Sequence, residues 1–272
     1  MRTALLAAPL FTLLAFAAQP LRAAGCSDDF AGPNLDPAWT FLDADGEPGG
    51  SARILSGKLE LAGKGSDAYK DVNEFVGVRR ADVAGDFDVS GKIESQANTH
   101  GWAQAGILAA VDAAAPGKGG YVVADVTPAN GFHLFYDAAG TQGTLDAHAD
   151  AGVSAYPVWI RLARTGAKFS AWYKTSAAGA WVSIAKDIAT QGTVGASQIA
   201  LVSLSHNDTT ENKTVFDDFA CQGAVTGVLP RARGPGMAGP QDATDALGRF
   251  QAAQTVLMLT NSRMPKRESS RP

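Results

Sequence analysis

The chain has 272 residues, of which 46% are hydrophobic and 18% are charged, and it contains 30 glycines. The apolar fraction is large enough for a hydrophobic core, which excludes wholesale disorder. Scarce charge and abundant glycine favour short strands joined by turns over long surface helices. Residues 23–221 carry a net charge of −10, and residues 222–272 carry +4. The acidic balance of the larger region excludes nucleic acid and other polyanions as partners.

Residues 1–25 have the pattern of a secretory signal peptide. Arg2 precedes the apolar run 3–18, and the small residues Ala23, Ala24 and Gly25 follow it. The run is interrupted by proline and is shorter than the roughly 20 apolar residues that a membrane-spanning helix needs. We therefore expect a signal peptide at 1–25, export to the periplasm or the extracellular space, and no transmembrane span in the mature chain.

The chain contains two cysteines, Cys26 and Cys221. Thiols in an oxidising compartment normally pair, and a disulfide between these two would connect the first strand of the fold to the last. Cys26 also directly follows small residues, as a lipid-modified cysteine at a mature N-terminus does, although Ala23 stands where such sites usually carry leucine. The two alternatives exclude each other, because a lipid-bearing Cys26 cannot form a disulfide.

Between the cysteines, short runs alternate between apolar and polar residues, and turn residues separate them. This pattern predicts strands and shows no convincing helical periodicity. The expected strands are 59–61, 87–93, 102–111, 121–126, 132–136, 158–164, 169–174, 199–204 and 214–219. A series of about ten strands without a helix is typical of an all-β fold, and we expect a two-sheet antiparallel sandwich.

The composition changes after Cys221. Residues 222–240 are rich in glycine and proline, which predicts a linker without helix or strand. Residues 241–272 are expected to form a short helix followed by a basic disordered tail. The domain itself is expected to span residues 26–221.

Five segments of this domain, in order along the chain, carry a resemblance to known proteins. They are Asp28–Trp39, Gly85–Phe87, Gln104–Leu108, Trp159–Arg164 and Val215–Phe219. On these residues the domain resembles the bacterial secreted laminin-G-like modules of the concanavalin A-like lectin/glucanase superfamily. The resemblance implies a jelly-roll sandwich of two curved sheets with a concave face. It also implies a connection to glycans, because many relatives bind or cleave them.

The sequence lacks the catalytic patterns that are common in hydrolases. Glucanases of this superfamily carry a Glu-x-Asp-x-Glu run on one strand, and none of the six glutamates begins such a run. A Gly-x-Ser-x-Gly elbow and a His-x-x-x-His pair are also missing, and we expect the glycine-rich residues 117–120 to form a turn between strands and not a phosphate-binding loop. We expect no catalytic residue and no cofactor, with a structural calcium ion as the alternative. The candidate calcium ligands, which would be neighbours if the first and last strands meet, are Asp28, Asp29, Asp217 and Asp218.

A sugar-binding site needs an exposed aromatic side chain and a few planar hydrogen-bonding groups. If the strands 102–111, 121–126, 132–136 and 158–164 all line the concave sheet, several such side chains converge there. The predicted ligand-binding residues are Trp102, Gln104, Tyr121, Asp125, His133 and Arg161. In the alternative interpretation, Trp102 and Tyr121 pack in the core, and Arg161 forms an ion pair with Asp125.

These patterns favour an exported, non-catalytic module that binds carbohydrate or another cell-envelope or extracellular ligand on the concave sheet. A glycoside hydrolase with an unrecognised carboxylate pair is one alternative, and a structural or adhesion module is another. The sequence carries no signal for an oligomeric state.

Overall fold

The computed structural model describes residues 25–44, 49–69, 72–137, 145–150, 155–189 and 198–225. The expected signal peptide, most of the linker and the whole tail lie outside these residues. The last strand runs through Val225, so the sheet continues past Cys221 into the residues that were expected to begin the linker. No helix in the described part of the chain is long and apolar enough to cross a membrane.

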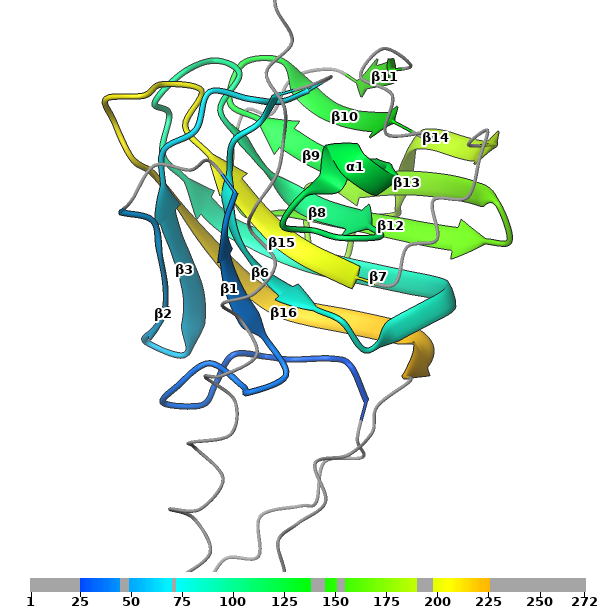
Figure 1. Cartoon of the computed structure of the whole chain (residues 1–272), viewed down its shortest axis with the longest axis horizontal. Coiled ribbons are helices and arrows are strands. Elements are labelled where there is room, and N and C mark those ends of the chain that lie inside the picture. Colours follow the sequence, from blue (N-terminus) through cyan, green and yellow to red (C-terminus); the bar gives the residue numbers. More distant parts are fainter. Residues whose placement is uncertain are drawn as a thin grey trace, which may run out of the picture. The chain divides into compact units, whose positions relative to one another are not determined.

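Two seven-stranded sheets make up the domain (Figure 1). Sheet I contains, in spatial order, β1 (Thr40–Asp43), β6 (Val76–Arg80), β15 (Gln198–Leu204), β8 (Gln104–Ala110), β9 (Tyr121–Thr127), β10 (Gly131–Asp137) and β11 (Leu145–Asp150). Sheet II contains β14 (Val182–Ala189), β13 (Lys168–Lys174), β12 (Val158–Thr165), β7 (Val83–Gln96), β16 (Asn212–Val225), β3 (Lys58–Gly63) and β2 (Ser51–Leu55). The remaining elements are the hairpin of β4 (Ala68–Tyr69) with β5 (Val72–Asn73) and the single helical turn α1 (Pro116–Gly119).

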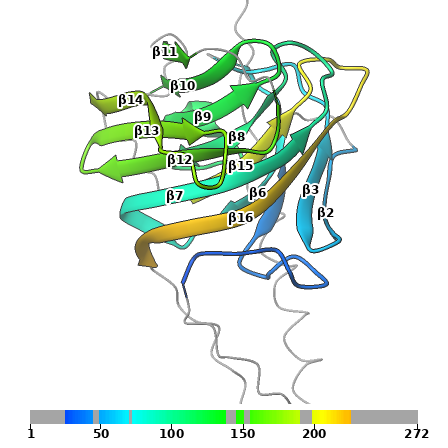
Figure 2. The same ribbon diagram turned by 180° about the vertical axis from the view of Figure 1, so that it is seen from behind.

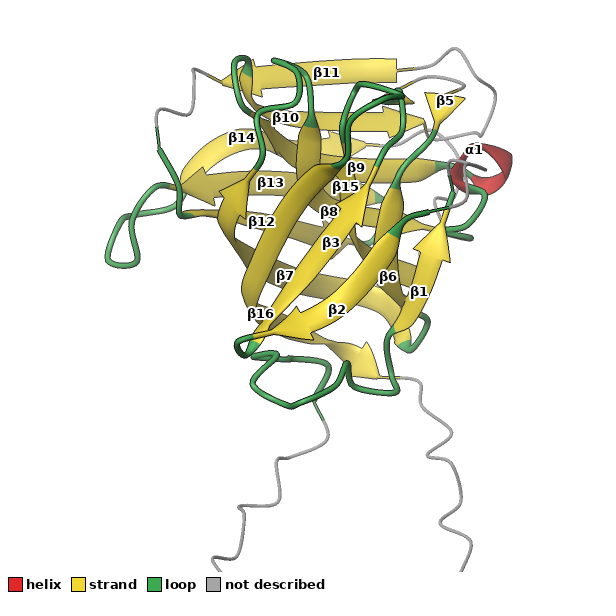
Figure 3. Cartoon of the chain, turned by 90° about the vertical axis from the view of Figure 1, so that its left-hand side faces the viewer, coloured by secondary structure: helices red, strands yellow, loops and turns green. Residues whose placement is uncertain are grey.

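The structure confirms the all-β antiparallel jelly-roll sandwich. All strand pairings in the two sheets are antiparallel among the described residues. Each of the expected strand segments falls in a strand, except that Trp102, Ala103 and Val111 at the two ends of the expected strand 102–111 lie just outside β8. Seen from behind, β7, β12, β13 and β16 of sheet II lie in front (Figure 2), and the side view shows the long, curved course of β7 and β16 (Figure 3).

The main core lies between the inner faces of the two sheets. On β12, Val158, Ile160 and Leu162 face inward and are fully buried, whereas the residues between them face outward. On β8 of the opposite sheet, Ile107 faces the same core. Each fully buried side chain of this size stabilises the fold by about 1.5–3 kcal/mol relative to exposure. The alternation therefore decides which side chains remain available on the outer faces.

A second apolar cluster covers the outer face of sheet I. It includes Leu108 on β8, Tyr121 on β9 and Phe135 on β10, packed with Phe75 from the segment after β5. The helical turn α1 also lies over this face (Figure 1). Because both faces of β8 are buried, this strand is almost wholly apolar in sequence. This cover leaves almost nothing of β8, β9 and β10 exposed.

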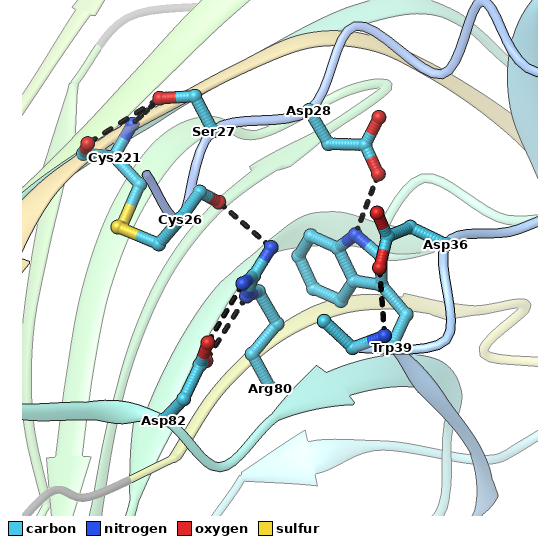
Figure 4. Close-up of polar contacts among 9 residues, drawn as sticks. Cys26, Ser27, Asp28, Asp36, Trp39, Arg80, Asp82 and Cys221 are labelled. Atoms are coloured by element: carbon cyan, nitrogen blue, oxygen red, sulfur yellow. Dashed lines mark hydrogen bonds and ion pairs between the residues drawn. A yellow bond between two sulfur atoms is a disulfide. The ribbon is translucent and has the colours of Figure 1, made fainter. Parts of the chain in front are cut away.

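The two ends of the domain are joined by a disulfide between Cys26 and Cys221, with the two Cα atoms 5.3 Å apart (Figure 4). Backbone hydrogen bonds between Asp28 and Phe219 continue the connection, at 2.8 and 2.9 Å. The predicted disulfide is thus present. It occupies the Cys26 sulfur atom, to which a lipid would otherwise be attached. Disulfides of this kind form in oxidising compartments.

Arg80 supports this junction from sheet I. Its guanidinium donates to the Cys26 carbonyl oxygen at 2.9 Å and pairs with Asp82 in a two-pronged contact, of which the shorter distance is 2.7 Å. It also lies over the ring of Trp39, with 5.3 Å between the guanidinium carbon and the ring centroid. Trp39 in turn donates its indole N–H to Asp28 (Figure 4). The buried cation is therefore paired and stacked, as burial of a charge requires.

Candidate functional site

A cavity of about 410 Å³ opens on the outer face of sheet I, where the apolar cover ends. Its volume falls in the range of roughly 300–1,000 Å³ that is usual for small-molecule sites. The lining residues come from β4 and the segment before it, from β8 and its preceding turn, from β10 and from the turn after β15. They are Asp67, Tyr69, Trp102, Gln104, His133, Phe135 and His206.

A buried histidine–aspartate pair forms part of the wall. His133 on β10 lies directly opposite Asp125 on β9, and Asp125 lies opposite Gly106 on β8. The His133 Nδ1 and the Asp125 Oδ1 are 3.0 Å apart, and the two residues are 1% and 0% exposed. A Cβ atom on Gly106 would lie 2.7 Å from the Asp125 Cα, so only glycine allows this close approach. The register of three strands thus fixes the pair.

Gln104 connects the sheet to the hairpin that overhangs it. Its Nε2 donates to Asp67 Oδ1 at 3.2 Å, and the backbone N–H of Ala68 donates to the same oxygen at 2.8 Å. Tyr69, at the end of β4, packs edge-on against Phe135 with 5.4 Å between ring centroids. These contacts place a carboxylate and a phenol ring at the rim of the cavity.

Trp102 forms the exposed aromatic side of the cavity. Its side chain is 42% exposed, and its ring centroid lies 5.5 Å from that of His133. The preceding residue, Gly101, accepts hydrogen bonds from the backbone of Ala129 at 3.1 Å and from the side chain of Asn130 at 2.9 Å. The β9–β10 turn therefore holds the Trp102 turn in position, although Trp102 is not itself in a strand.

Burial changes the proton affinity of both carboxyl groups. It raises the pKa of Asp125, and the hydrogen bond from His133 only partly opposes this effect. Burial also raises the pKa of Asp67, against the lowering effects of nearby His206 and of hydrogen bonds from Ala68 and Gln104. Carboxyl groups with raised pKa values in a cavity are a frequent mark of functional sites.

Four buried polar atoms around the cavity have no hydrogen-bond partner within the described structure: His133 Nε2, Asp125 Oδ2, Gln104 Oε1 and His206 Nδ1. Native proteins leave few such atoms unpaired, because each costs about 1–3 kcal/mol. Their position around one cavity makes this cavity the candidate site among the described residues.

The structure brings together four of the six predicted ligand-binding residues and separates two from them. Trp102, Gln104 and His133 line the cavity, and Asp125 lies directly behind His133. Tyr121 faces the same side of sheet I but is fully buried in the apolar cover, as the alternative interpretation has it.

The prediction that Arg161 joins this group is wrong, because β12 belongs to sheet II. Arg161 forms a two-pronged ion pair with Asp88 across the β12–β7 pairing, and its guanidinium carbon lies 4.6 Å from the centroid of the Trp172 ring. The alternative ion pair between Arg161 and Asp125 is wrong for the same reason. Strand alternation indicates a face of a strand but does not say to which sheet the strand belongs.

Sequence reasoning missed the other lining residues: Asp67, Tyr69, Phe135 and His206. Phe135 could have been found, because it lies two residues after His133 on the same face of β10. Asp67 and His206 come from connections between strands, where no periodic pattern exists to place them.

Three of the four candidate calcium ligands, Asp28, Asp29 and Asp217, have other partners. Asp28 accepts hydrogen bonds from Phe30 N and from the Trp39 indole, while Asp217 lies 3.6–3.7 Å from the ammonium groups of Lys92 and Lys58. No three histidine, cysteine, aspartate or glutamate side chains of the described residues gather as metal ligands. The N-terminal segment does meet the last strand, at Asp28 and Phe219, and the structural calcium ion stays a prediction.

No protein-family model matches the chain, and no curated protein matches it. Solved structures share its fold. A GH43 protein from Bacillus licheniformis gives a TM-score of 0.54 at 14% identity, over 72% of this chain and 39% of its own. A xylan beta-1,4-xylosidase from Bacillus halodurans C-125 gives 0.54 at 15% identity, over 76% and 41%. The chain thus spans about two fifths of these proteins, and the likeness is one of fold.

Proposed function

We propose that the protein is an exported module that binds carbohydrate in the cavity on the outer face of sheet I. The observation that carries the proposal is the half-exposed Trp102 indole beside the unpaired polar atoms of His133 and Gln104. A sugar ring presents an apolar C–H face that stacks on an aromatic ring, and its hydroxyl groups satisfy fixed polar atoms.

Three further observations support the proposal. The sequence resembles the concanavalin A-like lectin/glucanase superfamily, and solved structures of the same fold include a xylan beta-1,4-xylosidase. The Cys26–Cys221 disulfide fits a protein of the periplasm or the extracellular space. The rigid register that holds His133 and Asp125 keeps the binding groups in place before a ligand arrives, which limits the entropy lost on binding.

Affinity electrophoresis in gels that contain soluble polysaccharides, together with a glycan array, tests the proposal. The wild-type protein should be retained by at least one glycan, and Trp102→Ala should lose most of that retention. Trp172→Ala is the matched control, because Trp172 lies on the outer face of sheet II. Retention that survives Trp102→Ala but not Trp172→Ala would place binding on the wrong sheet and overturn the proposal.

Hydrolysis of a glycoside is the second candidate function. It is favoured by the raised pKa of Asp67 at the rim of the cavity, which suits a general acid, with Asp125 as the other carboxyl group. Release of reducing sugar from a polysaccharide that the protein binds, abolished by Asp67→Asn with retention in the gel preserved, would support this function. Retention without any release supports binding alone.

A further inference from the structure

The charge and hydrogen-bonding character of the cavity narrows the class of ligand. Asp67 lines it, Asp125 lies directly behind its wall, and no lysine or arginine is among the lining residues. Glu74 adds a third carboxyl group close enough to Asp67 to raise its pKa slightly. A ligand with a carboxylate or a sulfate would therefore meet repulsion from Asp67 that no lysine or arginine of the lining offsets.

Two of the unpaired side-chain atoms around the cavity, Gln104 Oε1 and Asp125 Oδ2, are oxygens that accept hydrogen bonds. Because Gln104 Nε2 donates to the Asp67 carboxylate, the free atom of that amide is the carbonyl oxygen. His133 pairs through Nδ1 with Asp125, and its buried Nε2 is left without a protein partner at the cavity. A ligand that supplies hydrogen-bond donors therefore suits this cavity better than a ligand that supplies acceptors.

Aromatic rings form the rest of the wall. Tyr69 and Phe135 pack edge to face, His133 stacks on Phe135 with 5.2 Å between centroids, and Trp102 continues the series on the exposed side. Faces of aromatic rings attract cations, and partial desolvation strengthens that attraction. Acceptors, carboxylates and aromatic faces together form the environment that a protonated amine prefers.

We infer that the cavity selects a sugar that carries a free, protonated amine over the same sugar with a hydroxyl or an N-acetyl group at that position. This inference rests on the proposed carbohydrate-binding function and specifies the ligand of that same site. An ammonium group offers three N–H donors and a full positive charge, whereas a hydroxyl offers one donor and no charge. An N-acetyl group offers one donor and brings an additional acceptor into a wall that already has an excess of them.

Titration calorimetry with methyl glycosides of glucosamine, N-acetylglucosamine, glucose and glucuronic acid tests the inference at neutral pH and moderate ionic strength. The amine should bind at least about tenfold more tightly than glucose, since a hydrogen bond to a charged group is worth about 1.5–3 kcal/mol. Glucuronic acid should bind most weakly of the four. Asp67→Asn should remove most of the preference for the amine over glucose.

Asp217→Asn is the matched control, because Asp217 is a carboxylate on the outer side of sheet II that pairs with lysines. It should leave all four affinities unchanged. Equal affinity for the amine and for glucose overturns the inference but leaves the proposed function standing. Loss of amine preference in Asp217→Asn, or its persistence in Asp67→Asn, also overturns the inference. Failure of every saccharide to bind refutes both the inference and the proposed function.

A pH series gives an independent readout. The titratable groups that face Asp67 are Glu74, His206 and, behind the wall, Asp125 with His133. Since burial raises the pKa of Asp67, acidification should weaken binding of the amine at a higher pH than an ordinary aspartate would, because the carboxylate becomes neutral. Binding of the neutral glucoside should change much less over the same range. An identical pH profile for the two glycosides contradicts the inference.

Discussion

Removal of the Cys26–Cys221 disulfide should strongly destabilise the domain. The two cysteines are 195 residues apart, so the bond closes almost the whole domain into one loop. In the chain-entropy treatment, a closed loop of this length removes unfolded-state entropy worth about 5 kcal/mol at 25 °C. That is a large part of the roughly 5–15 kcal/mol of net stability that is usual for a domain.

The folded state should change little when the bond is lost. The Asp28–Phe219 backbone hydrogen bonds and the contact of Arg80 with the Cys26 carbonyl hold the same two chain ends together. The loss of stability therefore arises mainly because the unfolded chain gains conformational entropy when the bond is absent. Because that chain also exposes more surface, the dependence of the unfolding free energy on urea concentration should become steeper.

Urea denaturation of wild type and of the double variant Cys26→Ala/Cys221→Ala, followed by tryptophan fluorescence and circular dichroism, measures this effect. The variant should lose about 4–5 kcal/mol of unfolding free energy and retain the wild-type far-ultraviolet spectrum. Wild type with its disulfide reduced is the control for the buried sulfur atoms, because it keeps them without the bond. A loss below about 1 kcal/mol with an unchanged urea slope would refute the argument from loop closure.

Three further outcomes are expected. Gly106→Ala should destabilise the domain by roughly 3 kcal/mol or more and abolish ligand binding, because the new Cβ would lie 2.7 Å from the Asp125 Cα. Thermal melts measure the loss of stability, and calorimetry measures the loss of binding. Asp67→Asn should become more stable relative to wild type as the pH rises through the raised pKa of Asp67, because ionisation of this carboxyl group in wild type opposes folding. Urea denaturation of both proteins from acid to neutral pH measures this difference in unfolding free energy. Asp88→Ala should cost only about 1 kcal/mol or less, because its ion pair with Arg161 is partly exposed, and glycan retention should not change.

Much of the fold could be predicted because alternation is strong in the strands that contribute to the core. The missed strands are mainly at the sheet edges. On β2 the outward-facing residues are exposed and the inward-facing residues are only half-buried, so apolar and polar residues do not alternate clearly along this strand. β6 is an inner strand, but Gly77 interrupts its apolar run. A Cβ at Gly77 would lie 2.5 Å from the carbonyl oxygen of Leu201, so the residue that weakens the local signal is the one that close strand pairing requires.

The candidate site was predictable only where it depends on the register of neighbouring strands. Gln104, Asp125 and His133 lie on the three consecutive strands of one sheet, and alternation places their side chains on a common face. Arg161 alternates equally well on β12, but pairing of β12 with β7 puts it in the other sheet. Asp67 reaches the cavity through a hairpin whose position depends on tertiary contacts such as the hydrogen bond from Gln104.

The outer cover of sheet I explains why a polar pair can remain buried at this position. Tyr121 and Phe135 exclude water from one side of the sheet, so that His133 and Asp125 lie in apolar surroundings. An apolar pair of similar volume would avoid the cost of the unsatisfied atoms His133 Nε2 and Asp125 Oδ2, about 1–3 kcal/mol each. Stability alone therefore gives no reason for polar residues here. The proposed ligand gives one, because a bound group that forms a hydrogen bond with His133 Nε2 recovers part of this desolvation cost. The same low polarity that makes the unpaired atom expensive strengthens that contact.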